Sequence, residues 1–408
     1  MGVVTEGGGD QKGKNLILAT VTSVHAISHF LSQGFLVALP AIREVLRIGP
    51  VEVGGIMAVR EIVSGMVSLP AGVICDRLRR YWGTVLAACM IGFGLGWMIV
   101  AFSTSFTMLV VGMVLLSVGG AIWHLPAMAA LSQCFTERRG TALAIHGVGG
   151  TVGDVLGPLA TGILLSYLTW RGLLGWYALF PLLLSAVVAW AFRSIHLMRQ
   201  EEEDPGLRDQ MQATRDLLKS GTLWALNLIS ALRGMSFQAY TTFLPLFLVD
   251  EIGLGLEGVG LHLGLLFSMG IIASPAMGYL SDRVGRKAVL MPTLVGLSGL
   301  SLILAWYGEG IALTVIICVL GLFLRSDYSL LSAMVLDAVG ENVATTTLGV
   351  MSFTRFALSA VSPLIAGILY EKMGMDAVLY YVAGIYGLAA VVLMVLRLPG
   401  KGDPEQSI

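Results

Sequence analysis

The sequence predicts an all-α integral membrane protein with twelve transmembrane helices in two pseudo-symmetric six-helix bundles. Three observations support this fold class: an apolar composition, a series of long apolar runs, and a charged motif that occurs twice, about half a chain apart. The first observation places the chain in a bilayer, the second counts its helices, and the third divides the helices into two groups.

The composition is that of a membrane protein. The 408 residues are 56% hydrophobic and only 12% charged, and the mean hydropathy is +0.83, whereas about a quarter of the residues in a soluble domain are charged. The formal net charge is −1, whereas a nucleic-acid binder carries an excess of basic residues. The sequence also has no glycine-rich loop ending in Gly-Lys-Ser/Thr. We therefore expect the protein to draw its energy from an ion gradient, a substrate gradient or a partner rather than from nucleotide hydrolysis.

Twelve apolar runs are each long enough to cross the membrane as a helix, which takes about 20 residues. A charged run, Glu201–Asp204, lies in the segment 194–219 between the two groups of six. The sequence therefore predicts bundles at 1–193 and 220–408, joined by a cytoplasmic linker at 194–219. The predicted spans are 15–42, 52–76, 81–102, 107–135, 139–168, 171–193, 220–249, 257–281, 287–307, 310–337, 343–371 and 376–397.

The distribution of basic residues orients the chain. With both termini in the cytoplasm, 17 of the 25 Lys and Arg residues fall in inside loops and tails, four fall outside and four lie within spans. Short cytoplasmic loops of membrane proteins carry such an excess of basic residues. We therefore expect cytoplasmic termini and a location in the bacterial cytoplasmic membrane.

An internal duplication relates the two groups of spans. Asp76 and Asp282 are 206 positions apart, and each follows a glycine by four positions and precedes a basic cluster. Nearly the same offset, 205 positions, relates Pro158 in the fifth span to Pro363 in the eleventh. Because the offsets agree at independent sites, the chain reads as the two-fold repeat found in many secondary transporters.

The repeated motif carries a resemblance to a known family. Twelve spans in two repeats, with Gly-x-x-x-Asp-Arg-x-Gly-Arg-Lys after the second and eighth spans, resemble the major facilitator superfamily over essentially the whole chain. This resemblance implies a secondary active transporter that works by alternating access. The second copy, Gly278 to Lys287, matches the motif fully. The first copy has Arg79 in place of the motif glycine, so we expect a less tight turn there.

The motif residues are predicted to form a cytoplasmic gate. An aspartate at the end of one helix, beside arginines and the N-terminus of the next helix, can form charge-assisted bonds that hold the two halves together. The alternative is that these residues only anchor the loops on the inside. The predicted gate residues are Gly72, Asp76, Arg77, Gly278, Asp282, Arg283, Gly285 and Arg286.

A small-residue motif in the fifth span favours export over uptake. Gly153-x-x-x-Gly157-Pro158-x-x-Thr161-Gly162 resembles the motif associated with drug and proton antiporters, with Thr161 replacing one glycine. Small residues let helices approach closely, and a proline bends a helix. The predicted hinge and packing residues are Gly153, Gly157, Pro158, Gly162 and Pro363.

A narrower resemblance lies in the fourth span. Gly119-Gly120-Ala-Ile-Trp123-His124-Leu-Pro126-Ala127, together with His29-Phe30-Leu31 in the first span, resembles the fosmidomycin-resistance branch of efflux carriers. Leu125 interrupts the His-Pro pair expected there. The resemblance again implies efflux.

Charged residues inside the spans are functional candidates, because a charge at mid-bilayer is costly unless it faces the bundle interior or a water-filled cavity. We expect Glu61 to pair with Arg355, for which substrate contact is an equal alternative, and Asp154 to face His262 or the cavity. Buried acids can carry protons, and the surplus of one positive charge favours an anionic or zwitterionic substrate. The charged candidates are Arg60, Glu61, Asp154, Arg233, Arg325, Asp327 and Arg355.

Five histidines lie within the predicted spans, and four of them are in the first group of six. His25 and His29 are four residues apart and share one helix face, while His124 and His146 lie in the fourth and fifth spans. Three roles stay open: packing and hydrogen bonding, substrate or proton handling, and binding of a transition metal with a third ligand from the fourth span. Packing is favoured, and no metal site is predicted. Trp123, beside His124, is expected to offer a flat wall to a substrate.

The predicted function is efflux of a small organic molecule coupled to proton entry. The alternative is a proton symporter or uniporter for a small organic anion, and the direction in which an imposed proton gradient drives the substrate distinguishes the two. An enzyme is disfavoured because no nucleophile or metal constellation is recognisable. Expected partners are the substrate, protons and the lipid bilayer. We expect no cofactor, no nucleic-acid partner, and a functional monomer.

Overall fold

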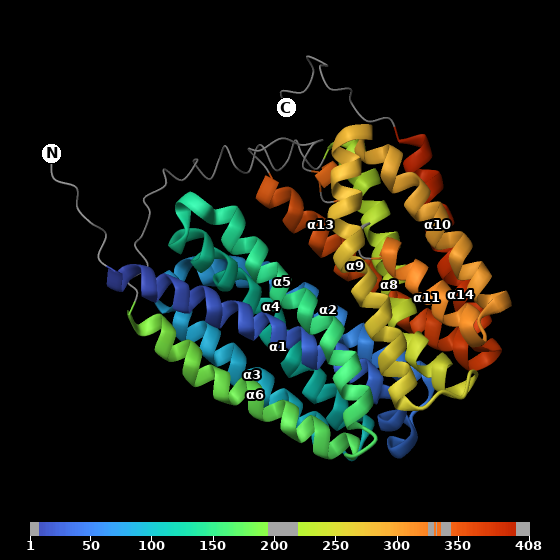
Figure 1. The fold of residues 1–408 in the computed structure, drawn as a ribbon, viewed down its shortest axis with the longest axis horizontal. Coiled ribbons are helices and arrows are strands. Elements are labelled where there is room, and N and C mark those ends of the chain that lie inside the picture. Colours follow the sequence, from blue (N-terminus) through green and yellow to red (C-terminus); the bar gives the residue numbers. More distant parts are fainter. Residues whose placement is uncertain (1–7, 195–218, 325–329, 332, 336–343, 397–408) are drawn as a thin grey trace. The chain divides into compact units, whose positions relative to one another are not determined.

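The computed structural model describes residues 8–194, 219–324, 330–331, 333–335 and 344–396, and within these ranges the chain is helical (Figure 1). The described residues form twelve α-helices and three short 3-10 helices, with no strand among them. The all-α class is therefore confirmed. The twelve-span, two-bundle arrangement stays a prediction, because most of the expected linker lies outside the described residues.

The helices form two compact units, and each unit includes a short segment from the other half of the sequence. The first unit contains α1 (Gly8–Leu46), α3 (Trp82–Ala101), α4 (Phe106–Cys134), α5 (Arg139–Leu164) and α6 (Trp170–Ala191). It also includes α2 (Pro50–Arg77) from Val63 onward and α9 (Leu256–Val284) as far as Gly264.

The second unit contains the helices of the C-terminal half. These are the remainder of α9, α8 (Gly221–Asp250), α10 (Arg286–Tyr307), α11 (Gly310–Leu324), α13 (Ala344–Ser359) and α14 (Val361–Val395). The start of α2, as far as Ile62, also belongs to this unit. Within the unit, α8 packs on α13 and α14, and α10 packs on α14.

Seven helical segments are long and apolar enough to cross a membrane, counting only the described residues. They are α1, α3, α4, α6, α9, α10 and the run Met351–Val395. The amphipathic composition of α5 explains why it is not among them. Its buried face consists mainly of glycine and polar residues, whereas large apolar residues such as Val148, Leu156 and Ile163 are exposed. A helix of this kind suits a membrane protein, since lipid is as apolar as a protein core.

The closest helix packing in the first unit joins α1 to α5, which run side by side in Figure 1. Gly149, Gly153 and Gly157 of α5 recur every four residues and therefore form one stripe. A Cβ atom at Gly153 would lie 2.1 Å from the carbonyl oxygen of Ala26, and one at Gly157 would lie 2.3 Å from that of Phe30. Only glycine permits this backbone approach, so the predicted packing role of the motif corresponds to the seam between α1 and α5.

The end of the fifth-span motif faces a different helix. A Cβ atom at Gly260 of α9 would lie 2.5 Å from the carbonyl oxygen of Pro158 and 2.9 Å from the Cα atom of Gly162. Thr161, the residue that replaces a motif glycine, is fully buried and hydrogen bonds to Tyr177. The motif thus packs against two helices of the first unit, α1 and the start of α9.

Two breaks divide the region predicted as the eleventh and twelfth spans. α13 ends at Ser359 and α14 begins at Val361, so Pro363 lies in the first turn of α14, where a missing N–H is tolerated. Further along, Gly374 has φ 75° and ψ −170°, a conformation that essentially only glycine adopts. This second break falls between the two predicted spans, at the expected position.

A carboxylate holds the Gly374 turn. The backbone N–H of Met375 donates a hydrogen bond of 2.8 Å to Oε1 of Glu251, which follows α8. Partial burial raises the pKa of Glu251, the nearby Asp376 and Asp250 raise this pKa further, and the hydrogen bond from Met375 opposes the shift. Burial and the neighbouring acids, rather than the hydrogen bond from Met375, therefore favour the protonated form of this carboxyl.

Substitution of the seam glycine tests the packing of α1 on α5. We expect Gly153→Ala to lower the free energy of unfolding by about 1–3 kcal/mol, because its Cβ would force the two backbones apart. Gly147→Ala on the same helix is the matched control, since a Cβ there meets nothing within 4 Å. Thermal unfolding in detergent measures the stability of both variants. Equal melting temperatures of the two would contradict the close packing of α1 on α5 at Gly153.

The pH dependence of stability tests the Glu251 contact. Because its pKa is raised in the folded state, folding binds a proton there, and stability falls as the pH rises from the ordinary pKa through the raised one. Glu251→Gln keeps an acceptor for Met375 without the charge. We expect the free energy of unfolding of this variant to exceed that of the wild type at neutral pH, by less than about 1 kcal/mol for an exposed side chain. At acid pH the two proteins should be equally stable in thermal unfolding. A variant less stable at neutral pH would contradict this contact.

Candidate functional site

A polar cluster lies in the first unit, where α1, α4 and α5 meet. α1 contributes His25 and His29, α4 contributes His124, and α5 contributes His146 and Asp154. Asp154 is completely buried and His146 is 4% exposed, while His25 and His29 are half-buried and His124 is exposed. The structure therefore brings together five side chains that the sequence singled out on separate helices.

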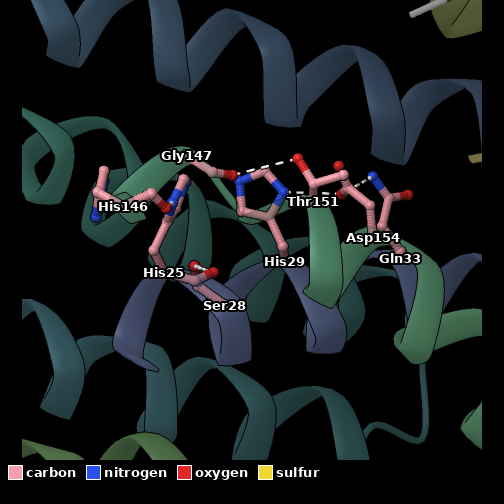
Figure 2. Close-up of polar contacts among 8 residues, drawn as sticks. All are labelled: His25, Ser28, His29, Gln33, His146, Gly147, Thr151 and Asp154. Carbon is pink, nitrogen blue, oxygen red and sulfur yellow. Dashed lines mark hydrogen bonds and ion pairs between the residues drawn. The ribbon is translucent and has the colours of Figure 1, made fainter. Parts of the chain in front are cut away.

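Asp154 is the centre of a hydrogen-bond network between α1 and α5 (Figure 2). Its Oδ1 atom lies 2.8 Å from Nδ1 of His29 and accepts a 3.0 Å hydrogen bond from Nε2 of Gln33. His29 and Gln33 are four residues apart, so both reach the same carboxylate from one face of α1. A carboxylate buried this deeply requires such partners, because an unpaired charge in a membrane interior is costly.

Gln33 is a member of the site that sequence reasoning missed. Its amide is uncharged, so a search for charges inside spans passes over it. The available signal was its spacing of four residues from His29, which places both side chains on one helix face.

The histidine rings pack against one another beside this network. His25 and His146 stack with ring centroids 4.1 Å apart, and the His25 ring meets His29 at 4.5 Å and His124 at 5.3 Å. Nδ1 of His25 donates a 2.9 Å hydrogen bond to the backbone oxygen of His146, so this nitrogen carries the proton. Trp123 is only 2% exposed and stacks beside His25 and His146.

Glycine makes room for the His25 ring. A Cβ atom at Gly150 would lie 2.6 Å from Cε1 of His25, so a side chain there would displace the ring. Thr151, the next residue, donates its hydroxyl to Gly147 O within the helix, at 3.2 Å. Thr151 and Gly147 are labelled in Figure 2.

A second group of polar residues lies in the second unit. Glu61 is 7% exposed, hydrogen bonds to the Gln238 side chain and interacts electrostatically with Arg60 and Arg355. Arg233 is 5% exposed and donates a 3.2 Å hydrogen bond to the backbone oxygen of Leu324. The expected pairing of Glu61 with Arg355 stays a prediction. The candidates Arg325 and Asp327 lie outside the described residues.

The second copy of the repeated motif forms a compact charged turn. Asp282 Oδ1 lies 2.5 Å from Nη1 of Arg286, which also donates a 2.7 Å hydrogen bond to Ser281 Oγ. Lys287 donates to the backbone oxygens of Met394 and Leu396, at the end of α14. A cation at the C-terminal end of a helix is stabilised by the partial negative charge there.

The remaining residues of the second copy shape the turn itself. Gly285 has φ 98° and lies between α9 and α10. The Arg283 guanidinium lies over the Tyr279 ring, 4.4 Å from its centroid. Gly278 lies one turn before Asp282, and a Cβ atom there would meet nothing within 4 Å.

The first copy of the motif turns differently. After α2 the chain continues through a 3-10 helix, Arg79–Tyr81, and none of its residues has a positive φ. The physical reason is that Arg79 has a Cβ atom, which disfavours the conformation that Gly285 adopts in the second copy. Arg77 is exposed, while the surroundings of Gly72 and the side chains of Asp76 and Arg79 lie outside what the structure describes.

Comparison with protein families matches residues 21–354 and 257–407 to the Major Facilitator Superfamily. The fosmidomycin resistance protein of Escherichia coli (strain K12) is 22% identical over 371 residues, covering 89% of this chain and 88% of that protein. The nitrite extrusion protein of Bacillus subtilis (strain 168) is 23% identical over 274 residues, covering 65% of this chain and 66% of that protein.

Among solved structures, a bacterial homologue of the human lysosomal transporter Spinster, in an inward-facing and occupied conformation, has a similar fold. The TM-score is 0.77 with 14% sequence identity, and the match covers 93% of this chain and 96% of that chain. At this identity the match establishes the fold and leaves the substrate open.

Neutralising the charged turn tests its predicted gating role. Asp282 is exposed, so we expect Asp282→Asn to change the free energy of unfolding by less than about 1 kcal/mol while reducing the transport rate, because the neutral amide loses the ion pair with Arg286. The exposed Glu309, substituted by Gln, is the control. Undiminished transport by Asp282→Asn would contradict the gating role of this residue.

Proposed function

The chain belongs to the Major Facilitator Superfamily, and we propose that it exports a small organic molecule in exchange for protons. The family and the relatives make it a multi-pass membrane transporter rather than an enzyme. In the proposed cycle, Asp154 carries the proton, and the substrate leaves the cytoplasm as the proton enters. Both termini are proposed to lie in the cytoplasm of a bacterial cell, and the protein is proposed to work as a monomer.

The buried carboxylate of Asp154 is the observation that supports proton coupling. An acid in a membrane interior is either ionised and held by donors or protonated and neutral. When ionised, Asp154 accepts charge-assisted hydrogen bonds from Gln33 and His29, which are stronger than bonds to a neutral acceptor. Taking up a proton removes this charge and weakens the bonds.

Weaker bonds at Asp154 provide a route from protonation to conformational change. His29 and Gln33 are both on α1, and Asp154 is on α5, so the protonation state sets how tightly these two helices are joined. A proton shifts a conformational equilibrium only if the two states bind it with different affinity. We propose that the state in which α1 and α5 separate at this point is the state that holds the proton.

The names of two relatives favour export. One is named for extrusion of nitrite, which is removal of a compound from the cell, and the other is named for resistance to fosmidomycin, which export of that compound would provide. The small-residue motif of α5, which resembles that of drug and proton antiporters, points in the same direction.

A second candidate function is symport or uniport of a small organic anion. In the second unit, Arg60 and Arg355 interact electrostatically with the buried Glu61, and Arg233 is buried in the same unit. Arginines inside membrane spans suit an anionic substrate, and one relative is named for an anion, nitrite. The sign of the coupling to protons, rather than the substrate charge, separates this candidate from the first.

Transport assays in inverted membrane vesicles with an acidified lumen test both candidates. With fosmidomycin as the first probe, we expect accumulation in the lumen and a matching loss of the pH gradient. Asp154→Asn should abolish both, because an amide cannot carry a proton. Glu137→Gln, which neutralises an exposed acid of the same unit, is the matched control.

Two outcomes would overturn the proposal. Expulsion of the substrate from vesicles with an acidified lumen would identify a symporter. Full proton-driven accumulation by Asp154→Asn would remove this residue from the coupling.

A further inference from the structure

We infer that His25, His124 and His146 form a binding site for a divalent transition-metal ion such as Zn²⁺. Each residue offers one ring nitrogen, and the three nitrogens lie within 4.8 Å of one another. They come from α1, α4 and α5, so the helix packing of the first unit assembles the site. The inference goes beyond the proposed exchange of substrate for protons and does not depend on it.

The hydrogen bond of His25 leaves one of its nitrogens available to a metal. Nδ1 must carry the proton, because its partner, the backbone oxygen of His146 at 2.9 Å, can only accept. In a neutral ring Nε2 then has a free lone pair. Histidine ligands in metal sites commonly donate their other nitrogen to a backbone carbonyl in this way, which fixes the orientation of the ring.

His146 supplies an independent observation. The residue is 4% exposed, and its Nδ1 atom is buried and has no hydrogen-bond partner among the described residues. Buried polar atoms of native proteins nearly always have a partner, and one without a partner is destabilising. Coordination of a metal ion would give this nitrogen a partner.

Metal binding requires the three histidine rings to reorient. In a tetrahedral zinc site the metal–nitrogen distance is about 2.0–2.1 Å, which places neighbouring ligand nitrogens about 3.3 Å apart. The three nitrogens lie within 4.8 Å of one another, and the His25 and His146 rings are stacked. Binding therefore requires these rings to rotate so that their nitrogens point at one ion.

The ligand set selects the class of metal. Three imidazoles suit Zn²⁺, Ni²⁺ or Cu²⁺, whereas Mg²⁺ and Ca²⁺ prefer oxygen ligands. Asp154 is not among the three residues, since its carboxylate is bonded to His29 and Gln33. Three protein ligands leave a fourth position for water or a donor atom of a bound anion. His124 is exposed.

Calorimetric titration of the purified full chain tests the site. The affinity tag is removed, chelator is used to strip metal, and ZnCl₂ or MgCl₂ is added to the protein in detergent. We expect about one equivalent of Zn²⁺ and no Mg²⁺ to bind. Substitution of His25, His124 or His146 by Ala should weaken Zn²⁺ binding by at least about tenfold, while His262→Ala on α9 should bind as the wild type does.

X-ray absorption of the zinc-loaded wild type keeps the test independent of whether the variants fold. The expected spectrum contains about three imidazole ligands. Absence of Zn²⁺ binding by the wild type, a spectrum without histidine ligands, or unchanged affinity in all three alanine variants would each overturn the site.

Discussion

The hydrogen bonds that hold Asp154 between α1 and α5 are the constraint on which the rest of the first unit depends. A carboxylate that is 0% exposed in a membrane protein is tolerated only where donors surround it, and here His29 and Gln33 reach it from α1. Such short contacts require the two helices to approach closely. The closest approach of the backbones, at Gly153 and Gly157, therefore lies beside Asp154 in the sequence of α5.

The same face of α5 serves both packing and chemistry. His146, Gly150 and Asp154 recur every four residues and lie beside the glycine stripe that contacts α1. Polar side chains and glycines lower the hydropathy of the helix, and its apolar residues point outward instead. Close packing thus brings ionisable groups of α1 and α5 within hydrogen-bonding distance, where a change of charge on one helix is felt directly by the other.

The sequence was sufficient for the class of fold and the family, because apolar runs and a repeated motif depend only on local composition and spacing. It also identified Asp154, His29 and His146 as candidates, since ionisable residues in apolar runs stand out. It did not reveal which of them pair, because this depends on the rotation of α1 relative to α5. His29 bonds to Asp154, whereas His25 lies with His124 and His146. Gln33 was missed because its side chain is uncharged. The 3-10 helix at Arg79–Tyr81 was not predicted because it depends on the backbone conformation.

Infrared difference spectroscopy of the purified transporter tests the central claim, that Asp154 is the group that gains and loses the proton. Titration from mildly acidic to mildly alkaline pH should change the C=O stretching band of a protonated carboxylic acid in the wild type. We expect this band to be absent from Asp154→Asn and shifted in Gln33→Leu, which lacks the donor to the same oxygen. An identical band in the wild type and Asp154→Asn would contradict the claim and assign the proton to another group.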